Sequence, residues 1–530
     1  MEKKFYLIIL SFLLILGTIL RVFNLGYSDY QGDEIKAFFN PAEDGDYIQF
    51  LLDQRKGPNQ FIVTGLLSGI TNNFDNYFLT RLPFAIAGVI SIYIFYLIVK
   101  KIFGERLSLI ATIFFVTNGF LIAFSRIVQY QSFVILFGLL GIYFYQIFRD
   151  KNLFKYLYLS LVSFAISILF HYDGVFFGIP VFIYFIQDFL KARKEKNKQF
   201  FIHLGGSFSL FLGILMTFYV PFVLNISEKT LEYWGGRLSG EVSSKISSSY
   251  YLFTVYQPIY SVHFYVLLSF FGLLIIFTPL ILKLFKKNLP KFVPIWNFDL
   301  NIFVIFIWAI VPFLFMEALV SIPGTHIYTY LIPVFIIMAY GIEFIIKLFQ
   351  DLNKKLLYFT SISSISLLGL FLYLQSYEAF VDHSRGEYPW QEKKFLIFTM
   401  NKPTPMYHLS MFGFPYYRNW KEAANYVNSS DKYYTTNDRV TITRYYVKLR
   451  KDGDKIGYYI YSKSPQTFSD ELSNSRVKKW VVAGNKPVKI INNPSGNNLE
   501  IYLLPESFEK PMPKNSNTIK VEEIGNEDGE

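Results

Sequence analysis

The sequence predicts an α-helical, multi-pass membrane protein of roughly eleven transmembrane helices, followed by a small extracytoplasmic α/β domain. Three observations predict this fold class. The chain is 52% hydrophobic and only 17% charged, whereas soluble chains carry about 25% charged residues. Its apolar runs have the length, about 20 residues, that crosses a hydrocarbon core of ~30 Å. Clusters of Lys and Arg fall at every second junction between these runs, as the positive-inside rule requires.

The first apolar run follows Met1-Glu2-Lys3-Lys4 and is not followed by a small-residue cleavage site. It is therefore predicted to remain as an uncleaved span with a cytoplasmic N-terminus. Eleven crossings then place the chain after about residue 376 outside the cell membrane. The predicted spans cover residues 5–23, 82–99, 107–124, 132–148, 155–170, 173–190, 201–224, 263–285, 301–320, 328–347 and 356–375.

Charge and cysteine content exclude several classes of function. The net charge of +11 lies mainly in short loops on one side, so topology and lipid headgroups account for it. Membrane lipids are therefore predicted partners and nucleic acid is not. The absence of cysteine excludes disulfides, thiolate metal sites and cysteine nucleophiles. No phosphate-binding glycine loop and no dinucleotide fingerprint is present, so soluble-nucleotide chemistry has no support.

Two long loops interrupt the predicted transmembrane domain, which covers residues 1–375. The first outer loop, residues 24–81, contains the short apolar segment Phe61–Ile70, which is expected to lie along the membrane interface or to re-enter. The second outer loop, residues 225–262, is rich in Ser, Gly and Tyr. The first loop also carries eight carboxylates: Asp29, Asp33, Glu34, Glu43, Asp44, Asp46, Asp53 and Asp75.

The tail after the last span has the composition of a small folded domain, predicted over residues 376–509. Trp420–Val427 has the pattern of a short amphipathic helix. Turn signals separate four predicted strands, and these are Arg439–Val447, Ile456–Tyr461, Lys479–Val482 and Leu499–Leu504. Residues 510–530 are polar and acidic and are predicted to be disordered.

The adjacent acids Asp33 and Glu34 are the first candidates for chemistry. They follow Gly32 close to the outer end of the first span. A partly desolvated carboxylate at a membrane interface can serve as a general base. The alternative is that both are ordinary solvated acids of a loop.

Two cations of the outer side are candidate phosphate ligands. Lys56 lies just before the short apolar segment, and Arg126 lies between the third and fourth spans, where the positive-inside rule disfavours arginine. Either side chain could bind a phosphate group. The alternatives are snorkelling to headgroups for Lys56 and interfacial anchoring for Arg126.

Four further outer-side residues are weaker candidates for substrate binding. They are His171, Asp173, His326 and Tyr328. A single histidine near a helix end is more often a hydrogen-bonded structural residue than a ligand. The spacing of His, Asp and Glu indicates no metal site.

Taken in order, five short motifs resemble those of a known family. These are Asp33-Glu34, Lys56-Gly57-Pro58, Thr80-Arg81-Leu82-Pro83, Phe103-Gly104 and Ser125-Arg126, and Tyr416–Ala424 resembles the start of the family's extracytoplasmic tail. Together they resemble the GT-C type integral-membrane glycosyltransferases, specifically the group of protein O-mannosyltransferases and aminoarabinose transferases. The likeness in layout covers most of residues 1–350.

The resemblance implies transfer of a sugar from a polyprenyl-phosphate donor on the outer face, with inversion. It implies that Asp33 takes the acceptor's proton and that Glu34 supports or replaces it. Lys56 and Arg126 would hold the donor phosphate, and Arg81 is assigned to the same role. The acceptor could be a protein, a lipid or a cell-wall glycan.

The chain departs from the family's pattern at two places. Gln129 and Gln131 stand where many members carry an acid, which leaves the donor sugar and the acceptor open; both are weak candidates for substrate binding. Gly57 stands where members usually have proline, which preserves a tight turn. The acids of the first outer loop permit a divalent cation without requiring one, so no cofactor is assigned.

The main competing interpretation is a multi-pass transporter or a flippase for lipid-linked sugars, and a non-catalytic membrane scaffold is a further one. Transporters usually show repeated halves and intramembrane charge. Here Glu317 and Glu343 are the main ionisable residues of the predicted spans, and the long loops all lie on one side. This asymmetry favours an enzyme with an outer-face active site.

Overall fold

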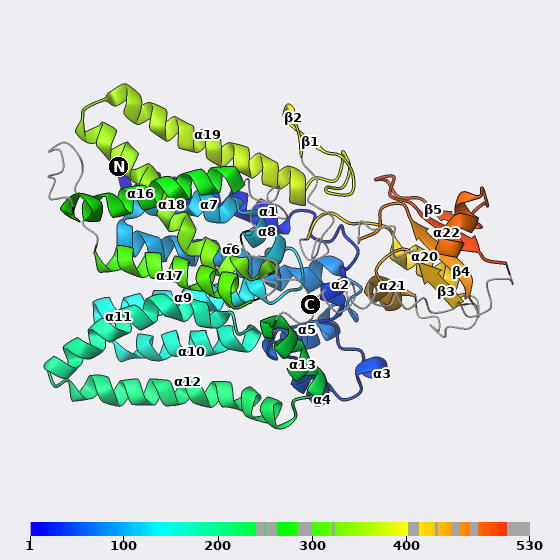
Figure 1. The fold of residues 1–530 in the computed structure, drawn as a ribbon, viewed down its shortest axis with the longest axis horizontal. Helices are drawn as coiled ribbons and strands as arrows, with labels where there is room; N and C mark the ends of the chain where they lie inside the picture. The colour runs from blue at the N-terminus through cyan, green and yellow to red at the C-terminus, as the bar shows by residue number, and fades with distance from the viewer. Residues whose placement is uncertain are drawn as a thin grey trace.

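A computed structural model describes residues 2–239, 249, 262–284, 299–320, 324–400, 413–429, 433–447, 456–466 and 475–505. A bundle of long helices forms one part of the molecule, and a small α/β unit from the C-terminal tail lies beyond one end of it (Figure 1). The short helices α2 to α5 lie at that end of the bundle, where α2 contacts α21 of the C-terminal unit and α4 and α5 contact the bundle helices α12 and α10. We call the bundle end at which α1 finishes, at Val22, the site end, and the opposite end the basic end.

Each of the eleven predicted spans coincides with a helix or with a bent helix pair. Nine described helices are long and apolar enough to cross a membrane, and the bent pair α7–α8 raises this number to ten. The remaining apolar helix, α10, is shorter and has 17 residues. The long helices are α1 (Glu2–Val22), α6 (Tyr77–Phe103), α9 (Gln131–Lys151), α11 (Gly174–Lys194), α12 (Lys198–Leu224), α16 (Val262–Leu284), α17 (Leu300–Ala318), α18 (Tyr328–Asp351) and α19 (Lys355–Phe380), with α10 at Phe154–Phe170. The chain is a multi-pass membrane protein.

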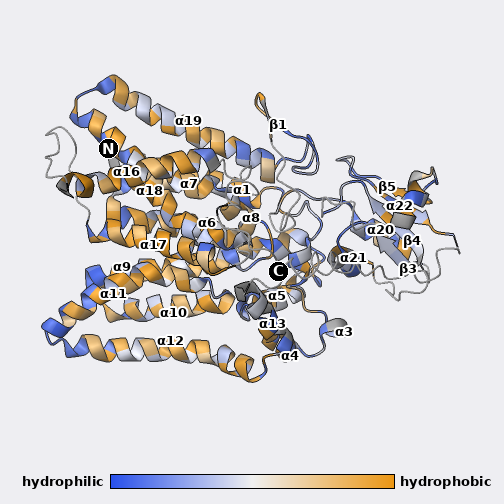
Figure 2. Cartoon of the chain, viewed as in Figure 1, coloured by the Kyte–Doolittle hydropathy of each residue, from blue (hydrophilic) through white to orange (hydrophobic). Residues whose placement is uncertain are grey.

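The surface of the bundle is suited to lipid. Large apolar side chains point outward on several helices; Ile8 of α1 is 67% exposed and Leu356 of α19 is 79% exposed. Hydrophobic residues cover most of the length of the helices, and the turn between α11 and α12 at the basic end is hydrophilic (Figure 2). A soluble protein would bury such apolar stripes against a second layer.

The third predicted span is broken by a bend of 59° between α7 (Glu105–Thr117) and α8 (Gly119–Ser125). Asn118 lies at the break and caps α8, because its side-chain oxygen accepts hydrogen bonds from the N–H groups of Phe120 and Leu121. The buried Arg21 of α1 donates to carbonyl groups at the end of α7. The polar backbone groups that the bend frees are thus satisfied by protein.

The first predicted outer loop folds into four short helices. These are α2 (Gly32–Ile35), α3 (Pro41–Asp44), α4 (Tyr47–Leu52) and α5 (Asn59–Ile70). The apolar segment predicted to be too short to cross therefore corresponds to α5 and is helical. Of the second predicted outer loop, residues 225–262, the structure describes α13 (Glu228–Ser239) and little else; most of that loop lies outside the described residues.

The C-terminal unit is built on a four-stranded sheet in the order β3-β4-β6-β5. Its strands are β3 (Tyr433–Thr436), β4 (Ile456–Ser462), β5 (Lys489–Ile491) and β6 (Leu499–Leu503). β3 and β4 are parallel, whereas β4–β6 and β6–β5 are antiparallel, with Tyr459 opposite Tyr502. A two-stranded hairpin, β1 (Lys394–Phe395) with β2 (Phe398–Thr399), precedes this unit.

Three of the five elements predicted in the tail are correct. The helix α20 (Trp420–Asn428) and the strands β4 and β6 lie where they were predicted. The predicted strands at Arg439–Val447 and Lys479–Val482 are wrong, because these segments form the helices α21 (Val440–Tyr446) and α22 (Ser475–Val482). The segment predicted to be disordered, residues 510–530, lies outside the described residues.

A buried ion pair joins the C-terminal unit to the site end. Arg418, which precedes α20, pairs with Glu387, which follows α19, and neither side chain is exposed. The other oxygen of Glu387 accepts a hydrogen bond of 2.8 Å from the Tyr27 hydroxyl, which follows α1. The backbone N–H of Arg418 donates to the Asp29 carboxylate at 2.6 Å. The tail is therefore attached directly to the segment that leads into α2.

Candidate active site

Asp33 and Glu34 lie on α2, a single helical turn at the site end of the bundle. Only 6% of Asp33 and 1% of Glu34 is exposed. The backbone N–H of Gln31 donates to Glu34 Oε2 at 2.9 Å, so the Glu34 side chain satisfies a donor at the start of its own helix. Both acids are thus buried, contrary to the alternative of ordinary solvated loop residues.

Glu34 is held in a bidentate ion pair with Arg81 of α6. Arg81 Nε and Nη2 lie 2.7 Å from the two carboxylate oxygens, and the N–H of Val128 donates to Oε1 at 3.1 Å. The remaining donors of Arg81 bind the backbone carbonyls of Leu25, Ser28 and Asp29. This geometry favours a positioning role for both side chains, and the predicted phosphate-binding role of Arg81 stays a prediction.

Asp33 faces a different environment, between two cations. Its Oδ1 lies 3.8 Å from Lys36 Nζ and 3.8 Å from Arg439 Nη2. Arg439 lies directly over Gly32, where an added Cβ would be 3.1 Å from the guanidinium group. Burial lowers the pKa of Lys36. Asp33 is therefore a carboxylate with cations on α2 and on the C-terminal unit as neighbours.

Arg439 is held in place by the buried carboxylate of Asp438. Oδ1 of Asp438 accepts hydrogen bonds from the N–H groups of Arg439 (2.7 Å) and Gln466 (2.8 Å), and the Tyr416 hydroxyl donates to Oδ2 at 2.5 Å. Burial raises the pKa of Asp438. Lys36 and Arg439 could not be predicted as site residues from the sequence, because neither lies in a recognisable motif and Arg439 belongs to the tail.

Arg126 lies next to the end of α1. Its Nη1 donates to the carbonyl oxygens of Leu20 (3.0 Å) and Phe23 (2.9 Å), which are among the unsatisfied acceptors of a helix C-terminus. The tail passes close by, because a Cβ added at Gly413 would lie 3.1 Å from Arg126 Cβ. This environment favours a structural role for Arg126, and its predicted phosphate-binding role stays a prediction.

Lys56 lies beside a second group of predicted residues. Its Nζ is 5.3 Å from the centre of the Tyr130 ring, and Tyr130 stacks on His171 with ring centres 4.1 Å apart. The turn after Lys56 requires glycine: Gly57 has a φ of +121°, and an added Cβ would lie 2.3 Å from the carbonyl oxygen of Leu169. The loop is thereby packed against the end of α10.

His171, Asp173, His326 and Tyr328 form one buried cluster. Asp173 Oδ2 lies 2.7 Å from His326 Nδ1 and accepts a hydrogen bond of 2.9 Å from the Tyr328 hydroxyl. Burial lowers the pKa of His171 to about 4. Burial alone would raise the pKa of Asp173, but the two imidazoles hold it below its usual value. Sequence spacing could not indicate this cluster, because 153 positions separate Asp173 and His326.

The segment between α8 and α9 connects the group around Asp33 and Glu34 with the buried cluster around His171. Val128 binds Glu34, and Tyr130, two positions later, stacks on His171. Gln129 and Gln131 flank Tyr130 and are 3% and 0% exposed. Neither amide atom of Gln131 has a hydrogen-bond partner within the described part of the chain. The predicted residues thus converge at one end of the bundle, on both sides of this segment.

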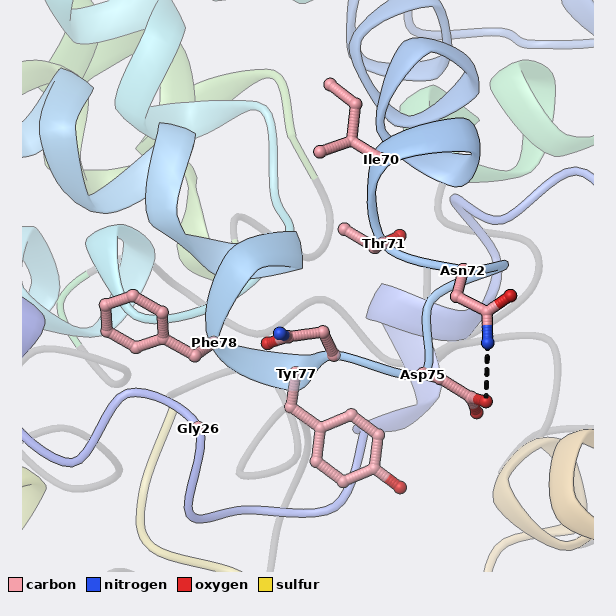
Figure 3. A pocket seen from close by; sticks show the side chains of 8 residues that line it. Gly26, Ile70, Thr71, Asn72, Asp75, Tyr77 and Phe78 are labelled. Atoms are coloured by element: carbon pink, nitrogen blue, oxygen red, sulfur yellow. Dashed lines mark hydrogen bonds between the residues drawn. The ribbon is translucent and has the colours of Figure 1, made fainter.

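A pocket of about 480 Å³ opens near α2, between the end of α5 and the start of α6 (Figure 3). It is lined by Gly26, Ile70, Thr71, Asn72, Asp75, Asn76, Tyr77 and Phe78. No predicted site residue lines it. The ring of Tyr77 contacts Tyr30 at a centre-to-centre distance of 4.5 Å, and Lys421 of the C-terminal unit pairs with Asp75 at 3.0 Å.

Comparison with known structures places this arrangement in a fold group. The structure of ArnT from Cupriavidus metallidurans in the apo state superposes with a TM-score of 0.52 and 10% sequence identity, covering 96% of this chain and all of that chain. The chain has the GT-C fold. A structure of the same ArnT bound to undecaprenyl phosphate superposes with a TM-score of 0.51 and 10% identity, covering 97% of this chain and 100% of that chain.

The sequence comparison agrees with the GT-C fold. Residues 56–218, from the first predicted loop into α12, match the family described as Dolichyl-phosphate-mannose-protein mannosyltransferase. No curated protein matches the sequence. The resemblance to GT-C membrane glycosyltransferases, inferred from short motifs, is therefore confirmed.

Proposed function

We propose that this protein transfers a sugar from a polyprenyl-phosphate carrier to an acceptor at the site end of the bundle. The observation that carries the proposal is the buried carboxylate of Asp33, which lies between two cations on a GT-C fold. The related ArnT structure, bound to undecaprenyl phosphate, supports a lipid-linked donor. The match to a mannosyltransferase family supports sugar transfer.

Asp33 is the proposed base. The acceptor hydroxyl gives its proton to the Asp33 carboxylate, its oxygen bonds to the anomeric carbon, and the bond from that carbon to the phosphate oxygen breaks. Inversion requires a base on the face opposite the departing group. Glu34 does not suit this task, because both of its oxygens are engaged by Arg81. Its proposed role is to fix α2 against α6.

Lys36, Arg439 and Lys56 are the proposed partners of the donor phosphate. Charge-assisted hydrogen bonds to phosphate are stronger than neutral ones, and preorganised cations stabilise the charge of a leaving phosphate. Lys36 and Arg439 lie next to Asp33, and Lys56 lies beside the segment that binds Glu34. The donor would thus enter between α2, the C-terminal unit and the loop before α5.

The proposed orientation follows from charge. Lys100, Lys101 and Arg149 lie at the basic end, where Lys101 pairs with Asp150 at 2.6 Å. The positive-inside rule assigns this end to the cytoplasm. The site end and the C-terminal unit then lie outside the cell membrane, where a polyprenyl donor and a protein, lipid or glycan acceptor meet.

The test is sugar transfer by the full chain reconstituted in vesicles and offered a panel of labelled polyprenyl-phosphate hexoses and pentoses. Membrane and cell-wall fractions serve as the source of acceptor. We expect one donor to lose its label to a new product, a glycosylated protein, lipid or glycan, that is separated from the donor by chromatography. If every donor stays intact and one changes leaflet instead, the protein is a flippase and the proposal is wrong.

Replacement of Arg439 by glutamine is expected to raise the KM for the donor about tenfold or more while changing kcat less. The loss of a hydrogen bond to a charged group costs ~1.5–3 kcal/mol. The matched control is Arg444→Gln, because Arg444 is exposed on α21, the helix that begins directly after Arg439. An Arg439→Gln protein with the wild-type KM would contradict the assignment of Arg439 to the donor phosphate.

A further inference from the structure

The cluster of His171, Asp173 and His326 has the composition of a metal site. His171 ends α10, Asp173 precedes α11, and His326 lies in the 3₁₀ turn Gly324–Ile327 before α18. The three side chains each offer a ligand atom, and these atoms all lie within 4.8 Å of one another. His171 and Asp173 have no exposed surface, and His326 is 9% exposed. Three separate elements therefore bring nitrogen and oxygen donors together away from solvent.

The hydrogen bonds within the cluster leave donor atoms unused. His171 Nδ1 accepts the backbone N–H of Asp173 at 3.1 Å and lies 3.2 Å from Asp173 Oδ1. Oδ1 accepts no hydrogen bond from any described residue, and the same holds for His171 Nε2 as a donor or acceptor. A buried carboxylate oxygen without a partner is costly. A cation bound by Asp173 Oδ1 and His171 Nε2, the two atoms without a hydrogen-bond partner in the described part of the chain, removes that cost.

The geometry is close to that of a bound cation. Zinc lies about 2.0–2.2 Å from nitrogen and carboxylate oxygen ligands, which places neighbouring ligand atoms of a tetrahedral site about 3.4 Å apart. The distance of 3.2 Å from His171 Nδ1 to Asp173 Oδ1 is near this spacing, whereas His326 Nδ1 and Asp173 Oδ2 lie at the hydrogen-bond distance of 2.7 Å and must move apart when an ion binds. Tyr328, which donates to Asp173 Oδ2, and Tyr130, which stacks on His171, orient the ligands as outer-shell partners do in metal sites.

We propose that His171, Asp173 and His326 bind one divalent transition-metal ion. Two imidazoles and one carboxylate suit zinc and its first-row neighbours, whereas magnesium and calcium prefer oxygen ligands alone. Three protein ligands leave a coordination position for water or a substrate oxygen. The site shares no residue with the Asp33 centre, although Lys56, a proposed donor ligand, lies beside the Tyr130 ring that stacks on His171; metal binding itself does not depend on the proposed transfer reaction.

The first test is metal binding by the full-length protein in detergent, stripped with a chelator and titrated with Co²⁺ or Zn²⁺. We expect one ion per chain, visible Co²⁺ absorption bands typical of nitrogen and oxygen ligands, displacement of Co²⁺ by Zn²⁺, and a higher Tm with Zn²⁺. Mg²⁺ should neither displace Co²⁺ nor raise the Tm. Failure of the wild type to bind Co²⁺ and Zn²⁺ would show that the cluster is a hydrogen-bond network only.

Variants of the proposed ligands then test which side chains bind the ion. His326→Gln and Asp173→Asn should lose the bound ion, whereas His203→Gln should retain it, since His203 lies on α12 and stacks on Phe154. Retention of the ion by His326→Gln would overturn the proposal. If these variants do not fold, X-ray absorption on the zinc-loaded wild type decides, because two imidazole ligands are expected and fewer than two would contradict the site.

Discussion

Asp33→Asn is expected to lower the rate of sugar transfer by about 10²–10⁴-fold, the contribution typical of a general base. Asparagine keeps the shape of the side chain but cannot take a proton at neutral pH. Asp33 is buried between Lys36 and Arg439, each 3.8 Å away, so the loss of its negative charge removes a counter-ion and costs some stability as well. The catalytic effect should appear as a fall in kcat of the folded protein, and the Tm is measured in parallel.

The measurement compares single-turnover transfer by reconstituted wild type and Asp33→Asn with the donor selected by the panel. Asp53→Asn is the matched control, because Asp53 is exposed in the same predicted loop, at the end of α4. Its transfer rate should equal that of the wild type. Full transfer activity of Asp33→Asn would contradict the role of Asp33 while still showing that the chain is a transferase.

Arg81→Gln is expected to destabilise the protein by about 3–5 kcal/mol, since it leaves the buried Glu34 without its partner. The pair is 1–2% exposed, and the arginine also holds backbone carbonyls of the segment before α2. The double variant Glu34→Gln/Arg81→Gln should recover part of this loss, because no buried charge is then left unpaired. Unfolding in a mixed-micelle SDS titration measures the free energies.

A surface pair supplies the control for this experiment. Lys100 and Glu105 lie 2.8 Å apart, but their side chains are 38% and 23% exposed. Glu105→Gln should therefore cost no more than about 1 kcal/mol. The opposite outcome is equally informative: a stable Arg81→Gln protein with a raised donor KM would support the phosphate-binding role that the sequence analysis assigned to Arg81.

The bundle could be predicted from sequence because a membrane imposes one simple requirement. Helices such as α12 and α19 are apolar over lengths that only a spanning segment needs. The tail lacks that constraint. In α21, Ile442 and Tyr446 are both buried, four positions apart, so its β-branched and aromatic residues form a helical face despite their strand propensity. The predicted boundary at residue 375 stays a prediction, and α19 continues to Phe380.

The site could be predicted only where its residues share a local motif. Asp33 and Glu34 are adjacent in the sequence, but Asp33 contacts Arg439 and Glu34 contacts Arg81. These different partners give the two acids different roles, and the motif itself does not indicate them. The histidine cluster could not be found from spacing, since its ligands come from elements that meet only in the folded bundle. These contacts depend on packing between elements that are far apart in the sequence, and the periodicity of hydrophobic residues does not indicate such packing.

The attachment of the tail to the segment before α2 also sets an order of events during synthesis. Ribosomes add about 5–20 residues per second. Glu34 and Arg81 are 47 residues apart, so they can meet within roughly 2–9 seconds of synthesis. Asp29 and Arg418 are 389 residues apart, which delays their contact by roughly 20–80 seconds. The nascent chain must therefore keep α2 in place with bundle contacts alone until the tail has been made.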